Sequence, residues 1–553
     1  MLQVKNLEIS FKSSPSVIQN ISFSLQQTEI LGVVGESGSG KSITSLAILG
    51  LLPNFATIKG EVLFNKQNLL TYTNKEFQKI RGSKIGMIFQ EPMSSLNPTL
   101  SCGFQVAEIL QQHTDLSKSE IKEEVISLFK KVKLPRPESI YNSYPHQISG
   151  GQKQRVVIAM AIACKPKILI ADEPTTALDV TVQKEIILLL KELQEEYKMG
   201  IIFISHDLAL VSEIADNVIV MYKGKIIEQG KADELFLHPR ENYTKALINS
   251  KPNTKKRFKI LPTVTDFIKN TVNTSLYSNE QRDIFHQKIY NQPPLLEIKN
   301  LHKDFISSAS WFANPTIVKA VNDVSFKIYE GETLGLVGES GCGKTTLSRT
   351  ILQLESATSG EIIYKGEDIT KLSKSAFKKL RKEIQIIFQD PFSSLNPRIT
   401  IGNAILEPMK VHNILNSLKE RKEYVYTLLE KVGLEKAHFY RYPHEFSGGQ
   451  RQRIGIARTI ALQPKLIICD ESVSALDVSV QAQVLNLLNQ LKAEFNFTYI
   501  FISHDLSVVK YMADQLVVMN KGKIEEIADA DEVYNNPKTS YTKTLIEAIP
   551  KGL

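Results

Sequence analysis

The chain of 553 residues has only four cysteines, one tryptophan and no long apolar run. The cysteines, Cys102, Cys164, Cys342 and Cys469, lie far apart and form no CxxC pair, so the sequence predicts neither a zinc site nor an iron–sulfur cluster. Charged residues break every apolar run well before the roughly 18 residues that a membrane-spanning helix needs. The first residues, MLQVKNLEISF, lack the basic segment and apolar core of a secretory signal. We therefore expect a reduced cytoplasmic protein without a transmembrane segment.

Net charge is also low for this length. The formal charge of +8 comes from 67 basic and 59 acidic residues spread over the whole chain, which does not argue for nucleic-acid binding. Hydrophobic residues make up 42% of the chain, enough for several buried cores.

The same series of motifs occurs twice along the chain. A phosphate-binding loop at 35–42 (GESGSGKS) returns at 338–345 (GESGCGKT), and four further motifs follow each loop in the same order. The offset between copies changes little, from 344 − 41 = 303 at the loop lysines to 504 − 206 = 298 at a later histidine. A repeat of this length predicts two large duplicated modules rather than a solenoid.

Apolar runs surround the motifs in each half. The runs EILGVVG and ETLGLVG end at the glycine-rich loops, and segments with helical spacing follow them. Two later runs, ILIAD at 168–172 and IIFISH at 201–206, are matched at 466–470 and 499–504. These patterns predict the α/β class: two tandem P-loop modules, each a mixed, mainly parallel sheet with helices on both faces.

The segments between the motifs divide the chain further. Charged helical patterns at 91–144 and 390–442 predict a helical subdomain inserted into each module. The polar stretch at 250–293 matches neither module, so we expect a first domain at 1–249, a linker of about 44 residues, and a second domain at 294–553. The basic linker residues predict a solvated tether, with contact to anionic lipid head groups as the alternative; they are Lys251, Lys255, Lys256, Arg257 and Lys259.

Loops of the form GxxxxGK[ST] bind phosphate because their glycines let backbone N–H groups wrap the negative charge at a helix N-terminus. The lysine adds a positive charge, and the hydroxyl of Ser42 or Thr345 can reach Mg²⁺. The loop alone fits any P-loop nucleotide hydrolase. The candidate nucleotide-binding residues are Gly35, Glu36, Ser37, Gly38, Ser39, Gly40, Lys41 and Ser42, then Gly338, Glu339, Ser340, Gly341, Cys342, Gly343, Lys344 and Thr345.

Paired carboxylates follow a predicted central strand in each half. Asp172–Glu173 and Asp470–Glu471 fall at the carboxyl edge of the sheet, beside the phosphate loop. In each pair the aspartate can hold Mg²⁺, and the glutamate can orient or deprotonate the attacking water. An isolated acidic pair would more often be a solvated turn, but the buried strand and the loop favour the catalytic interpretation.

A histidine and a glutamine recur at matching positions. His206 and His504 end the next strand within ISHD, and we interpret them as γ-phosphate contacts in the catalytic group. Gln90 and Gln389, at the entrance to the helical inserts, can reach Mg²⁺ or the attacking water. Taken alone, either glutamine would be an ordinary exposed amide.

A second glycine-rich helix start, SGGQ, occurs in each half. It predicts another phosphate-facing helix N-terminus, which a module that already has a phosphate loop can use only for a second module's nucleotide. The residues are Ser149, Gly150, Gly151 and Gln152, then Ser447, Gly448, Gly449 and Gln450.

In these motifs and their order, both halves resemble the nucleotide-binding domains of ATP-binding-cassette (ABC) proteins. The resemblance implies two ATP molecules with Mg²⁺ in an intramolecular head-to-tail sandwich, in which SGGQ of each half completes the other half's site. It also implies an adenine-stacking aromatic residue, for which Phe11 and Phe305 are candidates, and a loop between the sites at ALD, 177–179 and 475–477.

A narrower resemblance rests on SSLNP, on YPH before each SGGQ, and on YTKAL at 243–247 with YTKTL at 541–545. These motifs are similar to those of oligopeptide, dipeptide, nickel and glutathione importers with fused ATPase subunits. The resemblance implies an energy-coupling ATPase, peripheral at the cytoplasmic face of the inner membrane, that drives two permease subunits served by a solute-binding protein. Because the helical inserts diverge, we expect two different permease subunits.

Two alternatives stay open from the sequence. One is the ATPase of an exporter, and the other is a soluble tandem-cassette ATPase that acts on the ribosome or on DNA. The short, proline-containing linker and the lack of zinc-binding cysteines disfavour the soluble alternative. The transported solute is not encoded in these motifs.

Overall fold

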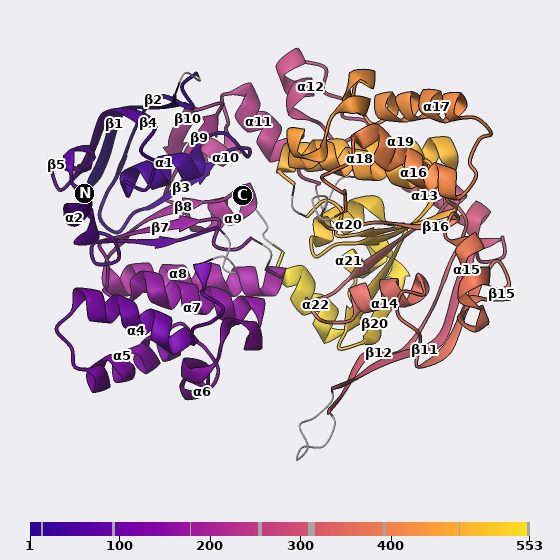
Figure 1. The fold of residues 1–553 in the computed structure, drawn as a ribbon, viewed down its shortest axis with the longest axis horizontal. Coiled ribbons are helices and arrows are strands. Elements are labelled where there is room, and N and C mark those ends of the chain that lie inside the picture. Colours follow the sequence, from indigo (N-terminus) through magenta and orange to yellow (C-terminus); the bar gives the residue numbers. More distant parts are fainter. Residues whose placement is uncertain are drawn as a thin grey trace. The chain divides into compact units, whose positions relative to one another are not determined.

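The computed structural model describes residues 1–12, 15–90, 95–176, 178–252, 257–307, 316–390, 394–474 and 476–549 (Figure 1). The chain divides into two compact units, Met1–Ile248 and Asn249–Ile549. In the described part of the chain, no helix is long and apolar enough to cross a membrane.

The first unit contains two sheets. An antiparallel sheet has the order β2-β1-β4-β5, and a six-stranded sheet has the order β10-β9-β3-β8-β7-β6, parallel except for the β9–β10 pair. The strands are β1 (Leu2–Phe11), β2 (Ile18–Leu25), β3 (Ile30–Val34), β4 (Ala56–Phe64), β5 (Gln67–Asn68), β6 (Ile85–Ile88), β7 (Ile168–Asp172), β8 (Gly200–Ile204), β9 (Asn217–Tyr222) and β10 (Lys225–Lys231). Strands β3, β7 and β8 are buried at every position, which explains their continuous apolar sequences.

Helices connect and cover these strands. Those of the central part are α1 (Lys41–Ile48), α2 (Asn74–Gln78), α7 (Gly150–Ile162), α8 (Val180–Tyr197), α9 (Leu208–Ile214), α10 (Ala232–Leu237) and α11 (Asn242–Asn249). The insert contains α4 (Cys102–His113), α5 (Lys118–Lys131) and α6 (Pro137–Asn142). Serine side chains cap α4 and α5 at Ser101 and Ser117, which fixes where these helices begin.

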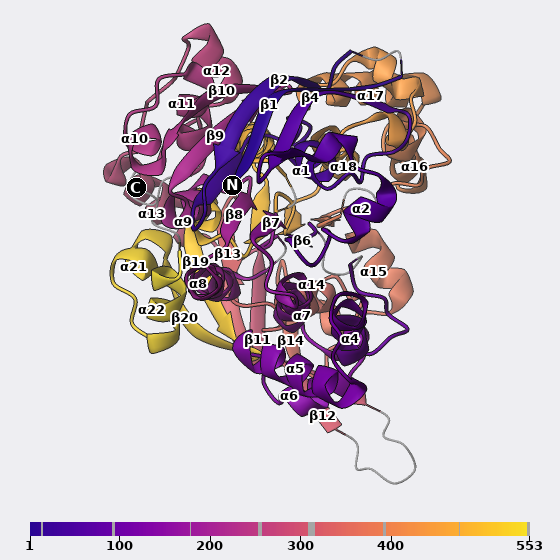
Figure 2. The same cartoon turned by 90° about the vertical axis from the view of Figure 1, so that its left-hand side faces the viewer.

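The second unit repeats this arrangement, with the sheet orders β12-β11-β14-β15 and β16-β17-β18-β13-β19-β20 (Figure 2). Its strands are β11 (Leu296–Ser307), β12 (Thr316–Ile328), β13 (Thr333–Val337), β14 (Ser359–Tyr364), β15 (Glu367–Asp368), β16 (Ile384–Ile387), β17 (Leu466–Asp470), β18 (Thr498–Ile502), β19 (Gln515–Asn520) and β20 (Lys523–Asp529). Its helices are α14 (Lys344–Ile351), α15 (Lys374–Leu380), α16 (Ile401–Val411), α17 (Leu418–Lys431), α18 (Gly448–Ile460), α19 (Val478–Phe495), α20 (Leu506–Met512), α21 (Ala530–Asn535) and α22 (Ser540–Glu547).

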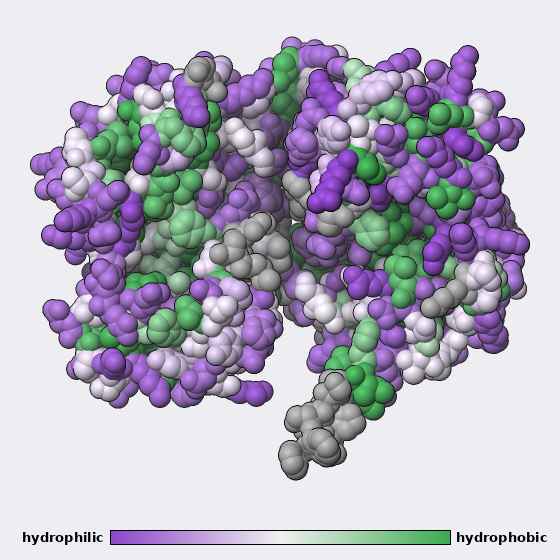
Figure 3. All heavy atoms as spheres, in the orientation of Figure 1, coloured by the Kyte–Doolittle hydropathy of each residue, from purple (hydrophilic) through white to green (hydrophobic). Residues whose placement is uncertain are grey.

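The predicted fold class is therefore confirmed, including both helical inserts. One core in each unit lies between the antiparallel sheet, the helix after the phosphate loop and one face of the central sheet. The β11–β12 ribbon is longer than its counterpart, and its outer end carries exposed apolar side chains, which colour it green in Figure 3; they are Phe305, Ile306, Ile317 and Val318.

The expectation of a solvated tether is wrong for residues 257–293. This stretch belongs to the second unit and contains α12 (Val264–Lys269) and α13 (Asn279–Tyr290). Leu261, Val264 and Ile289 are buried. Asn486 of α19 accepts the Leu261 N–H at 2.8 Å and donates its amide to the Leu261 carbonyl at 2.8 Å.

Opposite charges explain why this segment packs instead of remaining in solvent. Arg282 pairs with Asp529 at 2.9 Å and also with Asp531, which Arg257 approaches to 3.7 Å. His286 lies 3.4 Å from Asp514 Oδ1. We call the set Arg257, Arg282, His286, Asp514, Asp529 and Asp531 the linker clasp.

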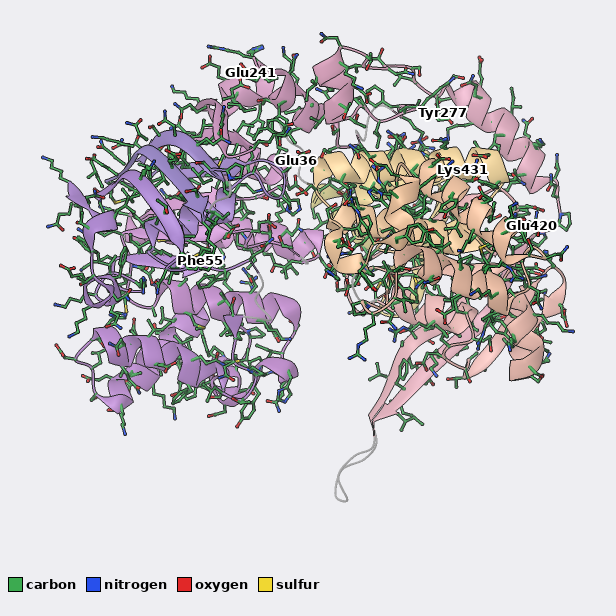
Figure 4. All side chains as sticks on the ribbon, turned by 45° about the horizontal axis from the view of Figure 1, so that its top comes forward. Glu36, Phe55, Glu241, Tyr277, Glu420 and Lys431 are labelled. Atoms are coloured by element: carbon green, nitrogen blue, oxygen red, sulfur yellow. The ribbon has the colours of Figure 1, made fainter. Side chains whose placement is uncertain are left out.

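The remaining linker lysines differ among themselves. Lys251 lies 3.7 Å from a carboxylate oxygen of Asp505. Lys259 is half-buried, with its ammonium 5.7 Å from the ring of Tyr277, which Figure 4 labels. Lys255 and Lys256 lie outside the described residues.

Candidate nucleotide sites

The phosphate loop of the first unit connects β3 to α1. Gly38 and Gly40 have φ of 77° and 102°, a region that L side chains rarely adopt, and Gly40 caps α1. Lys41 donates to the carbonyls of Gly35 and Glu36 at 2.7 and 2.9 Å, so its ammonium lies over the loop. Backbone N–H groups, a helix N-terminus and a cation thus converge where a polyphosphate binds.

The second phosphate loop repeats this geometry between β13 and α14. Gly341 and Gly343 have φ of 79° and 109°, and Lys344 donates to the carbonyls of Gly338 and Glu339 at 2.6 and 3.0 Å. Cys342 takes the position of Ser39, with its sulfur 3.7 Å from the Lys344 ammonium. Ser37 and Ser340 are exposed at the loop tips.

A tyrosine from the C-terminal part of each unit contacts the phosphate loop, which the motifs alone did not predict. The Glu36 N–H donates to the Tyr243 hydroxyl at 3.2 Å, and the Glu339 N–H donates to Tyr541 at 3.2 Å. Figure 4 labels Glu36. These tyrosines begin YTKAL and YTKTL, so the repetition of that motif was the available signal.

The catalytic candidates of the first unit meet at the carboxyl edge of its sheet. Glu173 accepts hydrogen bonds at Oε2 from Gln90 at 3.1 Å and from the Thr176 hydroxyl at 2.9 Å, and His206 Nδ1 lies 3.2 Å away. Burial alone would raise the pKa of Glu173, but the hydrogen bond and charge of His206, together with Thr176, lower it to about 2. The carboxylate is therefore ionised at neutral pH.

The second unit repeats the contacts with one fewer donor. Glu471 Oε2 accepts from Gln389 at 2.7 Å, and His504 Nδ1 lies 3.5 Å away. Ser474, at the position of Thr176, donates instead to the Glu471 backbone carbonyl at 2.9 Å. The hydrogen bond from His504 lowers the pKa of Glu471, although burial opposes it.

Both glutamates have a strained backbone. Glu173 and Glu471 have φ of 49° and 47°, in the left-handed region that non-glycine residues rarely occupy. Such conformations persist where surrounding contacts hold them, and they are frequent at active sites. In each unit this left-handed residue directly follows the central strand that ends at the preceding aspartate.

The aspartates fit a magnesium ion. Asp172 Oδ1 is buried and has no hydrogen-bond partner among the described residues. Burial raises the pKa of Asp172, while a hydrogen bond from Ser42 opposes the rise. Burial, then the charge of Glu471, raises the pKa of Asp470 to about 6. An unpaired buried carboxylate oxygen beside a hydroxyl suits a hard cation such as Mg²⁺.

Each SGGQ segment begins a long helix, as predicted. The Gln152 N–H donates to the Ser149 hydroxyl at 3.3 Å, and the Ser149 N–H donates to the Gln152 side chain at 2.9 Å; Ser447 and Gln450 repeat this capping box. The second glycine serves helix packing: a Cβ on Gly151 would lie 2.9 Å from Val182, and one on Gly449 would lie 2.3 Å from Val480. A Cβ on Gly448 would meet nothing within 4 Å, so this position is open to a ligand.

The remaining candidates are resolved in part. Phe11 packs against Phe55, with ring centroids 6.0 Å apart, and Figure 4 labels Phe55. Phe305 is exposed, with Lys303 4.9 Å above its ring. In the ALD loops, Ala177 and Ala475 lie outside the described residues. No group of three or more His, Cys, Asp or Glu side chains that could hold a metal occurs in the described ranges.

Two protein-family models match this chain. The family model for the ABC transporter matches residues 18–176 and 321–474. The chain belongs to the ABC transporter family. A second model, for the C-terminal region of oligopeptide/dipeptide transporters, matches residues 227–270 and 526–552. As an ABC ATPase, the chain binds and hydrolyses ATP.

Two curated relatives agree with the family match. The glutathione import ATP-binding proteins GsiA of Escherichia coli O6:H1 and of Shigella flexneri are each 44% identical, over 100% of this chain and 89% of their own length. A solved dimer of the ATP-binding cassette MJ0796 with ADP and phosphate matches 42% of this chain and 98% of its own chain, at 27% identity and a TM-score of 0.39.

Proposed function

We propose that this ABC ATPase is the energy-coupling subunit of a membrane importer for peptides or a related small solute. One observation carries the proposal: the C-terminal region typical of oligopeptide/dipeptide transporters occurs in both units and contacts the phosphate loop through Tyr243 and Tyr541. The relatives named for glutathione import, similar along the whole chain, support a peptide-like solute.

In each site, one group of residues would bind the phosphates and another would activate the attacking water. The loop N–H groups and Lys41 or Lys344 bind the β- and γ-phosphates. The Glu173 or Glu471 carboxylate orients the attacking water and accepts its proton while the bond between the β–γ bridging oxygen and the γ-phosphorus breaks, which releases ADP and phosphate.

The residues around each glutamate hold this geometry. Gln90 and His206 fix the carboxylate of Glu173 through the contacts of 3.1 and 3.2 Å. Ser42, Gln90 and Asp172 would hold Mg²⁺ in one site, and Thr345, Gln389 and Asp470 would hold it in the other. The ion would supply positive charge against the phosphates. We expect His206 and His504 to contact the γ-phosphate.

The assembly follows from the motifs. We propose that residues 1–249 and 294–553 act as the two nucleotide-binding domains and form an intramolecular head-to-tail sandwich. Ser447–Gln450 then completes the site of Lys41, and Ser149–Gln152 completes the site of Lys344. Phe11 and Phe305 remain the candidates for adenine stacking.

The partners are membrane subunits. We propose that the chain lies at the cytoplasmic face of the inner membrane and binds two different permease subunits, which receive solute from a binding protein. No nucleic-acid partner is expected. The divergent inserts, 91–144 and 390–442, supply the different docking faces.

Uptake in cells tests the proposal. Cells that carry the Glu173→Gln, Glu471→Gln double variant should lose ATP-dependent uptake of labelled di- and tripeptides or glutathione, and cells with the unchanged chain should retain it. The matched control is Glu196→Gln, an exposed glutamate that pairs with Lys131 far from the phosphate loop in sequence. Uptake of all these solutes by the double variant at the normal rate would refute an import role.

A further inference from the structure

The helix that follows His504 is capped by the side chain of the next residue, Asp505. The Asp505 Oδ1 atom accepts hydrogen bonds from the Ser507 N–H at 2.9 Å and from the Val508 N–H at 3.4 Å, which fixes where α20 begins. His504 Nδ1 lies 3.5 Å from a carboxylate oxygen of Glu471. The histidine is therefore held between the catalytic glutamate of the second unit and a helix whose start depends on one carboxylate.

The other oxygen of this carboxylate faces a linker lysine. Lys251 Nζ lies 3.7 Å from Asp505 Oδ2, and the two side chains are 24 and 25% exposed. The neighbours of the lysine, Ser250 and Pro252, are buried, and these linker residues belong to the second unit. Because packed backbone holds the lysine and the pair is partly shielded from water, the attraction is stronger than in a fully exposed pair.

This lysine follows the last helix of the first cassette. It comes 251 − 243 = 8 residues after Tyr243, whose hydroxyl accepts the Glu36 N–H of the first phosphate loop at 3.2 Å. Helix α11 makes up almost all of that connection. One short segment therefore contacts the first phosphate loop near one end and the Asp505 cap at the other.

The second copy of the motif has an apolar residue at the corresponding position. Ile549 comes 549 − 541 = 8 residues after Tyr541, as Lys251 comes after Tyr243. An isoleucine side chain cannot pair with a carboxylate. The sequence therefore gives the contact a direction, because only the end of the first cassette carries the charge that meets this helix cap.

We propose that Lys251 is a positioning residue of the second ATP site, which acts on His504 through the Asp505 cap. The inference rests on the proposed roles of Glu471 as the base and of His504 as a γ-phosphate contact. Without the ion pair, the chain directly after His504 would shift, and a misplacement of about 1 Å at a catalytic group is enough to lower turnover. Because the lysine follows α11, the first cassette would influence turnover at the second site alone.

Chains with one active site test the inference. Glu173→Gln leaves turnover to the second site, and Glu471→Gln leaves it to the first. Lys251→Met keeps the aliphatic part of the side chain and removes the charge. It should lower kcat roughly fivefold in the Glu173→Gln chain, with little change in KM for ATP, and should leave the rate of the Glu471→Gln chain unchanged. Lys251→Arg, which keeps the charge, should retain the rate in both.

The chain with both sites intact gives a second measurement. There Lys251→Met should leave about 60% of the rate, because one of two equal sites slows fivefold. This comparison decides the question even where Glu173→Gln alone silences both sites. The matched control is Lys259→Met, which removes another half-buried linker lysine, one that lies over the ring of Tyr277, and should leave the rate unchanged.

Hydrogen exchange read by mass spectrometry follows the cap directly. The amides of Ser507 and Val508 donate to Asp505, so Lys251→Met should make them exchange faster. The amide of Ala209, which donates to the corresponding Asp207 in the first unit at 3.0 Å, should exchange as before. A change confined to α20 is the signature of a local positioning role, whereas general destabilisation would accelerate exchange throughout the second unit.

Several results would overturn the inference. They are a normal rate in every Lys251→Met chain, an equal loss in the Glu173→Gln and Glu471→Gln chains, and a loss that Lys251→Arg shares. Failure of the underlying function looks different. If the Glu173→Gln, Glu471→Gln double variant still hydrolysed ATP, the proposed role of the glutamates would be wrong, whatever the effect of Lys251→Met.

Discussion

At the carboxyl ends of their central strands, the two cassettes place nearly the same groups. His206 and His504 lie 3.2 and 3.5 Å from Glu173 and Glu471. At the amino ends, both units share one contact, in which an aspartate accepts the first N–H of the strand before the phosphate loop at 2.8 Å. Among the described residues, this aspartate contacts a lysine and the linker in the second unit alone, where Asp514 lies 3.0 Å from Lys492 and 3.4 Å from His286.

The two ends of the sheet are therefore constrained differently. The nucleotide end is specified by short motifs, and both copies keep it. The opposite end carries no motif, and there Asp529 and Lys492 of the second unit stand where the first unit has Lys231 and Gln194. That exchange of charge creates the docking site for the linker in one unit alone.

The first prediction concerns the carboxyl end of the central sheet, where both units place the same groups, and it involves the largest change. Removing one carboxylate base costs on the order of a hundredfold at its own site. Glu173→Gln and Glu471→Gln should each leave at most about half of the ATPase rate, and the double variant should leave about 1% or less. The measurement is phosphate release by the purified chain, with nucleotide binding followed separately. A full rate in either single variant would show that its site only binds ATP.

The second prediction concerns the end that differs. Arg282→Ala removes the partner of Asp529 and Asp531 and should destabilise the second unit by about 3 kcal/mol, because it leaves two partly buried carboxylates short of a cation. Hydrogen exchange read by mass spectrometry should show faster exchange across residues 257–293. The matched control is Arg240→Ala, which removes an exposed pair with Glu234 and should change stability by less than about 1 kcal/mol. Unchanged protection of the linker in Arg282→Ala would contradict the clasp.

The third prediction uses pH. Burial raises the pKa of Glu332, beneath the linker clasp, to about 7. Its pKa is higher in the folded than in the unfolded state, so the unfolded chain loses this proton first and stability falls as pH rises from about 4.5 to 7. Asp514 has a lowered pKa, and its stabilising contribution is already complete in this window.

Glu332→Gln should therefore be more stable than the unchanged chain at pH 8, on the order of 2 kcal/mol, and should match it near pH 5. Urea unfolding at both pH values measures the difference. The neutral amide can accept the Tyr329 N–H at its carbonyl oxygen and donate its NH2 to the Tyr290 hydroxyl oxygen; these two groups now bond to Glu332 at 2.8 and 3.2 Å. An equal change at both pH values would mean that ionisation of Glu332 is not responsible.

The smallest effect tests whether the two phosphate loops are held alike. Tyr243→Phe and Tyr541→Phe each remove one acceptor from a loop N–H, which is worth about 1 kcal/mol, or roughly a fivefold rise in KM for ATP. The rate at saturating ATP should change little, because the loop positions the nucleotide and does not transfer the proton. Unequal effects would trace to the ring of Tyr222, which packs 4.3 Å from Tyr243 and is replaced by Asn520 in the second unit.

Much of the site followed from the sequence, because its parts are contiguous or end on apolar strands. The lysines, the acidic pairs and the SGGQ caps were predicted at residues where the structure has them. Each depends on local geometry: a strand, a glycine-rich turn and a helix start. The order of motifs then predicted which groups share one edge of the sheet.

Other features depend on contacts between distant residues. Tyr243 lies 207 residues from Glu36, and nothing in local spacing predicts their hydrogen bond. The strained backbone of Glu173 has no sequence pattern, because glutamate is not a residue that favours positive φ. The linker was mistaken for a tether because its partners, Asp529 and Asp531, lie about 250 residues away.

Because part of the linker is docked, the free chain between the two cassettes is short. A free stretch of 44 residues could extend to roughly 150 Å, but only eight peptide steps separate Asn249, at the end of α11, from Arg257, where the clasp begins. That stretch spans at most about 30 Å. A partner confined within such a radius is present at on the order of 10 mM, so each cassette meets the other far more often than it meets a second chain. In the proposed sandwich, opening and closing would pivot about this short connection, and inserting a few glycines beside Pro252 would loosen the pivot without changing any residue of the ATP sites.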